Sequence, residues 1–281
     1  MTSGLFGPGR CRVMGVVNVT PDSFSDGGRW LDADTAVRHG LDLVAEGADL
    51  VDVGGESTRP GALRIDAEEE LRRIIPVVTG LVGEGVIVSV DTMRAEVAER
   101  ALDAGAALIN DVSGGRADDR MTQVAATSGV PIVLMHWRGH ADGMQKLTHY
   151  DDVVKDVVHE LGVQVEEALS AGVRPDQVII DPGLGFSKTG EQNWTVLAHL
   201  DAFTALGYPV LVAASRKRFL GELLADDAGE QRPTDQREAA TTAISTLAAQ
   251  AGVWCVRVHE PAATADAVRV VTRLAEEGKE S

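Results

Sequence analysis

Polar and charged side chains recur in this sequence where short apolar runs end, so that a folded chain could bring them together. The residues concerned are Asn18, Glu56, Asp91, Asn110, Asp111, His136, Asp181, Ser215, Arg216, Lys217, Arg257 and His259. A carboxylate can accept two parallel N–H bonds from a planar ring. Arg257 and His259 are two residues apart, so on a strand both side chains would leave on one face and could reach one anion. The pattern therefore indicates one binding or catalytic site.

The elements that must position these residues alternate between short β-branched runs and longer amphipathic stretches. The predicted strands span residues 13–17, 50–53, 86–90, 107–110, 131–135, 178–180, 210–213 and 253–258. The predicted helices span residues 32–46, 66–82, 94–104, 120–128, 152–171, 191–206, 236–251 and 262–277, and residues 225–233 are expected to form a loop. Strands that alternate with helices of this length pair in parallel. Almost wholly apolar strands are typical of a sheet that is covered on both faces.

Eight consecutive strand–helix units favour a closed (β/α)8 TIM barrel, which needs about 250 residues, and we expect a single domain over residues 1–281. A doubly wound open sheet is the competing fold. However, Asn18-Val19-Thr20-Pro21 follows the first strand in place of a dinucleotide-binding glycine motif. In a barrel all eight strand ends meet at one mouth, where active sites lie. A single polar residue there could be a helix cap, but capping poorly explains all eight.

The charge and composition narrow the classes of function. The chain has 43 acidic and 26 basic side chains and a net charge of −17, which argues against a general nucleic-acid binder and against binding to an anionic membrane. A small anionic ligand is compatible with this charge, because the local field governs a cleft. Cys11 and Cys255 lie in apolar runs without metal-type spacing, and we expect buried thiols in a reducing cytoplasm. We expect neither a membrane span nor a signal peptide.

Seven longer motifs contain the polar strand ends. They are MGVVNVTPDSFSDGG, VDVGGESTRPGA, SVDTMRAEVAERALDAGAALINDVSGG, VLMHWRG, DPGLGFSKTGEQN, SRKRFLG and VRVH, and they run from Met14 to His259. In this order they resemble the signatures of the dihydropteroate synthases, a family of pterin-binding TIM barrels. The resemblance implies condensation of 6-hydroxymethyl-7,8-dihydropterin diphosphate with 4-aminobenzoate, with release of pyrophosphate, in folate biosynthesis. It also implies that sulfonamides mimic the aminobenzoate and that the protein is a homodimer formed through late helices.

The resemblance assigns the pterin to residues from several strand ends. They are Asp91, Asn110, Asp181 and Lys217, with Met135 on the floor of the pocket and Arg257 against the ring. The edge of a pterin needs acceptors and donors in one plane, which carboxylates, an amide and an ammonium supply. For Asp91 and Asp181 the alternative is capping within the following loop. For Met135 the alternative is a plain core position.

The leaving pyrophosphate needs local donors, because the protein as a whole is acidic. The resemblance assigns the diphosphate to Asn18, Thr58, Arg59, Arg257 and His259. It also implies Mg²⁺ as the cofactor, with Asn18 as the protein ligand. An amide oxygen is a suitable hard ligand when water and phosphate oxygens fill the other positions of the ion. Arg59 could instead be a solvated loop arginine.

The resemblance places 4-aminobenzoate between two loops, at residues 20–28 and 57–62. The expected contacts are Phe24, Thr58, Arg59, Pro60, Phe186 and Lys217, and the expected catalytic residues are Asp26, Lys217 and Arg257. Loop closure would exclude water, and Asp26 would stabilise positive charge as the carbon–oxygen bond breaks. The aniline nitrogen would then attack a pterin methylene cation without a strong general base. Arg218 stands where many relatives have serine, which weakens one contact to this substrate.

Two other functions stay open. A pterin-dependent methyltransferase would share the acids at the pterin edge but would not need a diphosphate site, so the diphosphate residues favour the synthase. A catalytically inactive paralogue would keep the barrel and bind a pterin or a partner, although some such relatives have decayed motifs and these are intact. Pyrophosphate release that depends on both 4-aminobenzoate and Mg²⁺ would identify the synthase.

Overall fold

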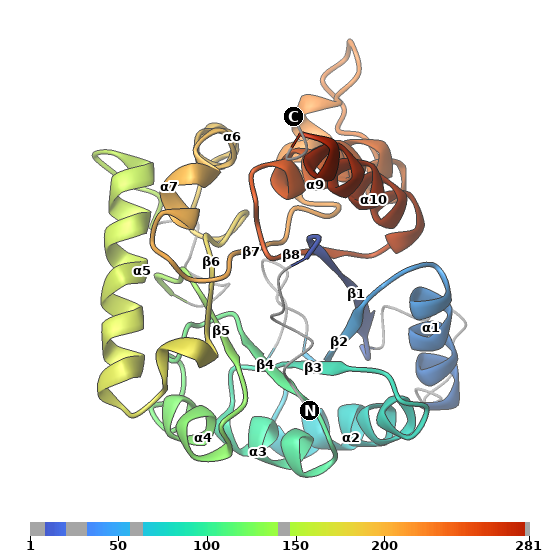
Figure 1. The fold of residues 1–281 in the computed structure, drawn as a ribbon, viewed down its shortest axis with the longest axis vertical. Helices are drawn as coiled ribbons and strands as arrows, with labels where there is room; N and C mark the ends of the chain where they lie inside the picture. Colours follow the sequence, from blue (N-terminus) through green and yellow to red (C-terminus); the bar gives the residue numbers. More distant parts are fainter. Residues whose placement is uncertain (1–8, 21–32, 57–63, 140–146, 279–281) are drawn as a thin grey trace.

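A barrel of parallel strands forms the centre of the molecule (Figure 1). The computed structural model describes residues 9–20, 33–56, 64–139 and 147–278. The strands are β1 Arg12–Asn18, β2 Leu50–Gly54, β3 Val88–Asp91, β4 Leu108–Asp111, β5 Ile132–Met135, β6 Val178–Asp181, β7 Leu211–Val212 and β8 Cys255–Val258. They pair in the order β6-β5-β4-β3-β2-β1-β8-β7, and a parallel bridge from Ile180 to Val210 joins β6 to the segment before β7. The (β/α)8 barrel predicted from the sequence is confirmed.

Helices alternate with the strands and surround them (Figure 1). They are α1 Ala33–Ala45, α2 Ala67–Gly83, α3 Ala95–Asp103, α4 Met121–Ser128, α5 Val153–Ser170, α6 Gly190–Ala198, α7 Leu200–Thr204, α8 Arg218–Leu223, α9 Glu238–Gln250 and α10 Pro261–Glu277. The helix expected over residues 191–206 is divided at His199, whose φ of −126° and ψ of 40° are not helical. Helix α8 was not predicted, because six residues are too few to show a helical period.

Side-chain caps fix where several helices begin. Asp66 accepts the N–H of Glu69 at the start of α2. At the start of α5, Asp152 accepts the N–H groups of Val154 and Lys155. Thr189 and Gln192 form a reciprocal capping box at the start of α6. These bonds satisfy N–H groups that have no partner within the helix. They also hold the segments that lead from the strand ends into the helices.

The alternation of side chains along the strands builds the barrel interior in layers. One buried apolar layer consists of Met14, Leu50, Leu108, Val133, Ile179, Leu211, Ala213 and Cys255. The residues between them pack outward against the helices in a larger core. Because the side-chain period of a strand is two, the residues two positions further along point inward as well: Val16, Asp52, Asn110, Met135, Asp181 and Arg257. A largely polar layer therefore lies above an apolar floor and faces the mouth.

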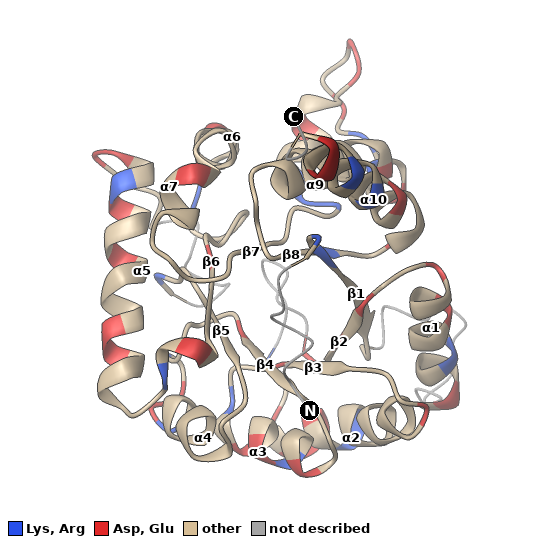
Figure 2. Ribbon diagram, in the orientation of Figure 1, with Lys and Arg blue, Asp and Glu red and all other residues tan. Residues whose placement is uncertain are grey.

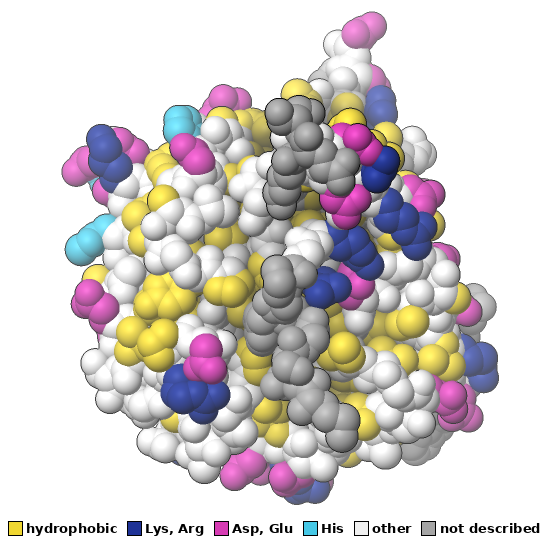
Figure 3. All heavy atoms as spheres, in the orientation of Figure 1, with side chains coloured by type: hydrophobic (Ala, Val, Ile, Leu, Met, Phe, Trp, Pro, Cys, Tyr) yellow, Lys and Arg dark blue, Asp and Glu magenta, His cyan; other side chains and the backbone are white. Residues whose placement is uncertain are grey.

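Charged side chains lie mostly on the outer helices (Figure 2). In the space-filling view many of them lie near the outer edge of the molecule (Figure 3). Cys11 and Cys255 are free and buried, as expected. Burial raises the pKa of the Cys11 thiol to about 12 and raises that of Cys255 as well, so both stay protonated near neutral pH. Among the helices of the described segments, none is both long and apolar enough to cross a bilayer.

Candidate active site at the barrel mouth

The polar layer above the apolar floor is held together by bonds between four strands. Arg257 on β8 donates from Nε to Oδ2 of Asp52 on β2 at 2.6 Å, and from Nη2 to Oδ2 of Asp91 on β3 at 2.8 Å. Nδ2 of Asn110 on β4 donates to the same Asp52 oxygen at 2.8 Å. The other oxygen of Asp52 is buried and has no hydrogen-bond partner among the described residues. One acceptor oxygen of this array is therefore left without a donor.

Two carboxylates share one guanidinium in this array. Burial raises the pKa of Asp91 to about 7, while Arg257 acts to lower it and the charge of Asp52 acts to raise it. Burial also opposes the charge of Arg257, but the two aspartates outweigh it and raise the pKa of the guanidinium. Asp91 does not cap the following helix, since the N–H of Ala95 bonds to Asp118 instead. A buried acid with a raised pKa beside a cation is a candidate for ligand binding.

Asp181 ends β6 and points into the same mouth. Its Oδ1 accepts the N–H of Gly183 at 2.7 Å. This bond lies within the loop and caps no helix, since α6 begins at Gly190 with Thr189 as its cap, and Oδ2 is left for a ligand. Burial raises the pKa of Asp181, and the nearby ammonium of Lys217 acts in the opposite direction. Met135 is buried and pairs with Asp181 across β5 and β6, which suits a position on the floor of a pocket.

Lys217 and Phe186 lie together beside Asp181. The ammonium of Lys217 donates to the carbonyl of Leu184 and is 4.9 Å from the centre of the Phe186 ring. Burial lowers the pKa of Lys217 to about 8, with Asp181 opposing the shift and Arg257 adding to it. A cation over an aromatic face is a favourable contact. The structure thus brings together two residues that the sequence assigned to the aminobenzoate.

Asn18 and His259 stand at the ends of β1 and β8. Asn18 is opposite Gly54 in the strand register and points inward by the alternation from Met14. Nδ1 of His259 is 2.8 Å from Oγ of Ser215, and the same oxygen accepts the backbone N–H of His259 at 3.2 Å. The Ser215 hydroxyl can then donate to Nδ1, which puts the proton of a neutral imidazole on Nε2.

Part of the expected site is not brought together in the structure. Arg257 and His259, which were expected to share one anion, turn to different partners here, the former to carboxylates and the latter to Ser215. The remaining expected residues lie outside the described residues: Phe24, Asp26, Thr58, Arg59 and Pro60.

Asp52 is a site residue that the sequence analysis missed. It lies in the middle of the apolar run of β2, whereas most of the expected site residues on strands stand at or near the ends of their runs. The available signal was its spacing of two residues from Leu50, together with its acidic character inside a strand. A fully buried aspartate needs a partner, and Arg257 and Asn110 provide it.

His136 was expected to join the other strand ends at the mouth, and this was wrong. It follows Met135 directly, so the alternation turns its ring away from the barrel interior toward α5. There its Nε2 is 2.9 Å from Oε2 of Glu160. The ring is fully buried. Burial and then the charge of Lys188 lower the pKa of His136 to about 4.

The mouth can be compared with those of known proteins. The sequence profile of a family described as pterin binding enzyme matches residues 14–259. The dihydropteroate synthase of Mycobacterium leprae is 56% identical over 261 residues, which cover 92% of this chain and 92% of the relative. The dihydropteroate synthase of Xanthomonas albilineans solved with 4-aminobenzoic acid has a TM-score of 0.87 and 47% identity, covering 95% of this chain and 93% of that chain.

A second structure of the Xanthomonas albilineans enzyme, in complex with 7,8-dihydropteroate, has a TM-score of 0.84 and 44% identity and covers 95% of this chain and 94% of that chain. The residues that match the family, 14–259, include the contribution of every strand to the polar layer. The chain belongs to the pterin-binding enzyme family and, within it, to the dihydropteroate synthases.

Proposed function

We propose that the barrel mouth joins 6-hydroxymethyl-7,8-dihydropterin diphosphate to 4-aminobenzoate and releases 7,8-dihydropteroate and pyrophosphate, as a step of folate biosynthesis. The observation that carries this proposal is a buried layer of acceptors closed by two cations: Asp52, Asp91, Asn110, Asp181, Lys217 and Arg257. Such a layer suits a planar ring with N–H donors on its edges and a carbonyl beside them. The known complex of a related synthase with 7,8-dihydropteroate supports it.

In this proposal the pterin lies flat across the polar layer. Asp181 accepts the two N–H groups of the amino-pyrimidine edge, as a carboxylate can, with Oδ2 taking the larger share because Oδ1 already accepts from Gly183. Asn110 and Asp91 meet the ring groups on the far side, and Lys217 donates to the ring carbonyl. Met135 forms the floor and Arg257 lies against the ring.

The diphosphate is proposed to lie on the side of β1 and β8. Asn18 and His259 would contact it there, with Thr58, Arg59 and Arg257 as further partners. Asn18 fits Mg²⁺, because its single amide oxygen at the end of β1 suits an ion that keeps phosphate and water oxygens in its other positions. When bound, Mg²⁺ would neutralise charge on the pyrophosphate.

The proposed reaction is a dissociative displacement. The bond from the pterin methylene carbon to the diphosphate oxygen breaks with its electron pair on oxygen, and the lone pair of the aminobenzoate nitrogen then bonds to the carbon. The nitrogen loses one proton to solvent or to the pyrophosphate. Asp26 would stabilise the developing cation, while Lys217 and Phe186 would orient the amine. An aniline is unprotonated near neutral pH, so no strong general base is required.

Pyrophosphate release tests the proposal. The purified, folded protein is expected to release pyrophosphate from the pterin diphosphate only when both 4-aminobenzoate and Mg²⁺ are present, with dihydropteroate detected by chromatography. No release by folded protein would contradict the proposal. Pterin binding without turnover would favour the inactive paralogue, and methyl transfer from a methylated pterin would favour the methyltransferase.

A homodimer formed through the last two helices is part of the proposal. Leu247 of α9 and Val270 and Leu274 of α10 expose 63%, 59% and 68% of their surface, and the two helices lie side by side (Figure 1). Exposed large apolar side chains on neighbouring helices suit a self-complementary interface. Sedimentation equilibrium is expected to give a dimer for the wild type and a monomer for Leu274→Glu, and a monomeric wild type would contradict this.

We also place the protein in the cytoplasm. Its two free, buried thiols support this assignment, since a reducing compartment keeps cysteines in that form. Cell fractionation with immunodetection tests it, and recovery of the protein outside the cytoplasmic fraction would contradict it.

A further inference from the structure

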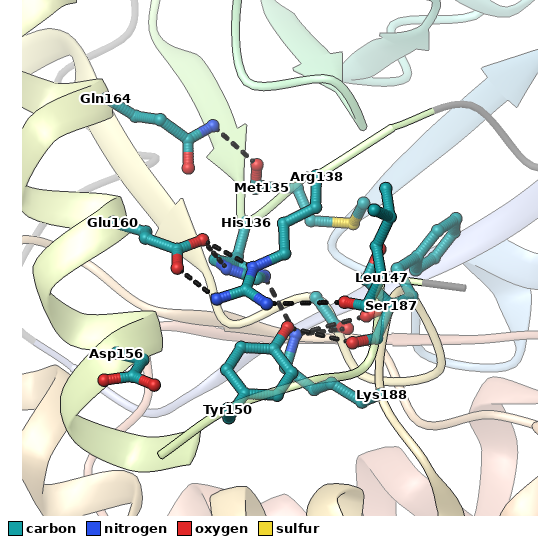
Figure 4. A network of polar contacts seen from close by, with 12 residues as sticks. Met135, His136, Arg138, Leu147, Tyr150, Asp156, Glu160, Gln164, Ser187 and Lys188 are labelled. Atoms are coloured by element: carbon teal, nitrogen blue, oxygen red, sulfur yellow. Dashed lines mark hydrogen bonds and ion pairs between the residues drawn. The ribbon is translucent and has the colours of Figure 1, made fainter. Parts of the chain in front are cut away.

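A second polar network lies outside the barrel interior, between β5, the loop after β6 and α5 (Figure 4). Arg138 donates from Nε to Oε2 of Glu160 at 2.9 Å and also pairs with the other oxygen. Its guanidinium lies over the ring of Tyr150, 3.8 Å from the centre. Glu160 Oε2 is 2.9 Å from Nε2 of His136, and Nδ1 of His136 is 2.9 Å from Nζ of Lys188. The contacts therefore run from a half-buried arginine to a buried lysine.

One arrangement of protons satisfies this network. As an ammonium, Lys188 is a donor only, so His136 accepts at Nδ1 and donates from Nε2 to Glu160. His136 is then neutral, in keeping with its lowered pKa. Burial acts to raise the pKa of Glu160, but the bonds from Arg138 and His136 outweigh it and lower the pKa. Burial lowers the pKa of Lys188 to about 7, and the charge of Asp181 opposes the shift.

Lys188 ties this network to the loop that follows β6. Its Nζ has two further acceptors, the carbonyls of Gly183 at 3.1 Å and of Phe186 at 3.3 Å. Together with His136, these carbonyls occupy all three ammonium hydrogens. The hydroxyl of Tyr150 donates to the carbonyl of Ser187 at 2.9 Å. The loop backbone is therefore held by a buried side chain on one side and by a tyrosine on the other.

The loop needs this support because its backbone is strained. Ser187 has a φ of 48°, in the left-handed region that is unfavourable for residues other than glycine, whereas Gly183 adopts a φ of 69° without strain. A Cβ at Gly183 would lie 2.5 Å from the carbonyl oxygen of His136. Such conformations persist only where the surroundings fix them, and the bonds of Lys188 do so here.

The same loop carries the groups that face the amine side of the mouth. The carbonyl of Leu184 accepts from Lys217, and the Phe186 ring lies 4.9 Å from that ammonium. Asp181, in contrast, is held by the sheet, since its carbonyl accepts the N–H of His136 at 2.8 Å. A shift of the loop would therefore move Phe186 and Lys217 directly, while Asp181 would lose at most the bond from the Gly183 N–H to its Oδ1.

We propose that Lys188 is a positioning residue for 4-aminobenzoate, because its bonds to Gly183 and Phe186 fix the loop that places Phe186 and Lys217. The inference rests on the proposed function, which assigns the aminobenzoate to Phe186 and Lys217. Lys188 acts through these groups, since its own ammonium hydrogens are occupied by the loop and by His136.

Steady-state kinetics of Lys188→Met at saturating concentrations of the other substrate test this role. Methionine keeps an unbranched apolar chain but removes the three donors. The KM for 4-aminobenzoate is expected to rise roughly tenfold, whereas the KM for the pterin diphosphate is expected to rise less, because Asp91 and Asn110 hold the ring from other strands. A purely structural role would reduce the amount of active enzyme and leave both KM values unchanged. An unchanged aminobenzoate KM in folded Lys188→Met would overturn the proposal.

Tyr150→Phe decides the question if Lys188→Met does not fold. It removes only the hydroxyl that bonds to the Ser187 carbonyl, and the aminobenzoate KM is expected to rise about threefold. In that case a wild-type KM in Tyr150→Phe would overturn the proposal.

Two matched controls are Lys155→Met, whose side chain is 83% exposed, and Tyr208→Phe, which precedes β7 at the end of the barrel opposite the mouth. Both are expected to keep wild-type KM values. An inactive wild type would reject the proposed function itself, whereas an active wild type with a wild-type KM in the test variants would reject only the role of Lys188.

Discussion

The polar layer inside the barrel and the network around His136 differ in how completely their hydrogen bonds are satisfied. Inside the barrel, Asp52 and Asp91 share the guanidinium of Arg257, and one Asp52 oxygen is buried without a partner among the described residues. In the second network both oxygens of Glu160 are bonded, and the three hydrogens of Lys188 meet three acceptors. Buried polar groups need partners, so the first region has an acceptor left for the donor of a ligand, whereas the charged groups of the second are satisfied without one.

The proposed roles of the two regions therefore differ: the polar layer binds a ligand, and the network around His136 positions a loop. In an incomplete layer, the donors of a ligand satisfy acceptors that are already desolvated, so the benefit appears only on binding. A network whose charged groups are already paired fixes a loop before any ligand arrives. Such preorganisation reduces the conformational entropy that is lost when the ligand binds. Substitutions in the first region are therefore expected to change pterin affinity or the stability of the barrel. Substitutions in the second are expected to change how well the amine is oriented.

The largest effect is expected from Arg257→Met, which leaves Asp52 and Asp91 buried together without their cation. Removing one partner of a buried ion pair costs roughly 3–5 kcal/mol, so urea unfolding is expected to show a loss of about that size, together with loss of turnover. Arg138→Met is the comparison in the second network. Its loss is expected to be about 1 kcal/mol, because Arg138 and Glu160 keep 22% and 27% of their side-chain surface exposed. Equal losses of unfolding free energy in the two variants would contradict the proposed difference between the two regions.

A smaller effect is expected from Asp181→Ala, measured as pterin affinity by calorimetry. The variant would leave ring donors buried and unpaired, at a cost of roughly 1–3 kcal/mol. Glu160→Gln, in the complete network, is expected to leave pterin affinity within about twofold, because the second network acts on the amine side. Unchanged affinity in Asp181→Ala would remove this residue from the pterin pocket.

The pKa values of the incomplete layer predict how pterin binding depends on pH. Burial raises the pKa of Asp91 to about 7, so this residue becomes an ionised acceptor only as the pH rises through that value. Burial lowers the pKa of Lys217 to about 8, so its ammonium donor is lost at higher pH. Pterin affinity is therefore expected to rise with pH, to peak between these two values and then to fall by several-fold.

Calorimetry over a range of about pH 6 to 9 checks this profile. Asp91→Asn cannot ionise at this position, so it is expected to flatten the acidic side of the profile and to retain the alkaline side. If the acidic side persists in Asp91→Asn, another group is responsible for it.

The comparison also shows which features the sequence could predict. The barrel and the strand-end residues were predictable, because one topological rule brings all strand ends to one mouth. His136 was not, since a shift of one residue along a strand reverses the face of the sheet, and Asp52 was missed because it lies inside an apolar run rather than at its end. His136 lies one residue beyond the end of β5, a boundary that apolar patterning does not fix to a single position. The role of Lys188 depends on the backbone conformation of a loop, for which the sequence has no periodic signal.

The smallest effect concerns an exception within the second network. Ser187 has a φ of 48°, a conformation that costs about 1–2 kcal/mol for a residue other than glycine, and its Oγ is buried without a partner among the described residues. Ser187→Gly removes both penalties, against about 0.5–1 kcal/mol for the greater freedom of glycine in the unfolded chain. A net gain of about 1 kcal/mol is expected, or a rise of a few degrees in Tm.

Ser187→Ala is the matched control, because it removes the hydroxyl and keeps the strained φ, and its gain is expected to be smaller. A loss of stability in Ser187→Gly would mean that the serine hydroxyl is satisfied and that the strain is offset elsewhere. The glycine variant also widens the range of φ open to the loop, so it is expected to bind 4-aminobenzoate no more tightly than the wild type. Stability and amine affinity should then change independently, as expected if the second network positions the loop.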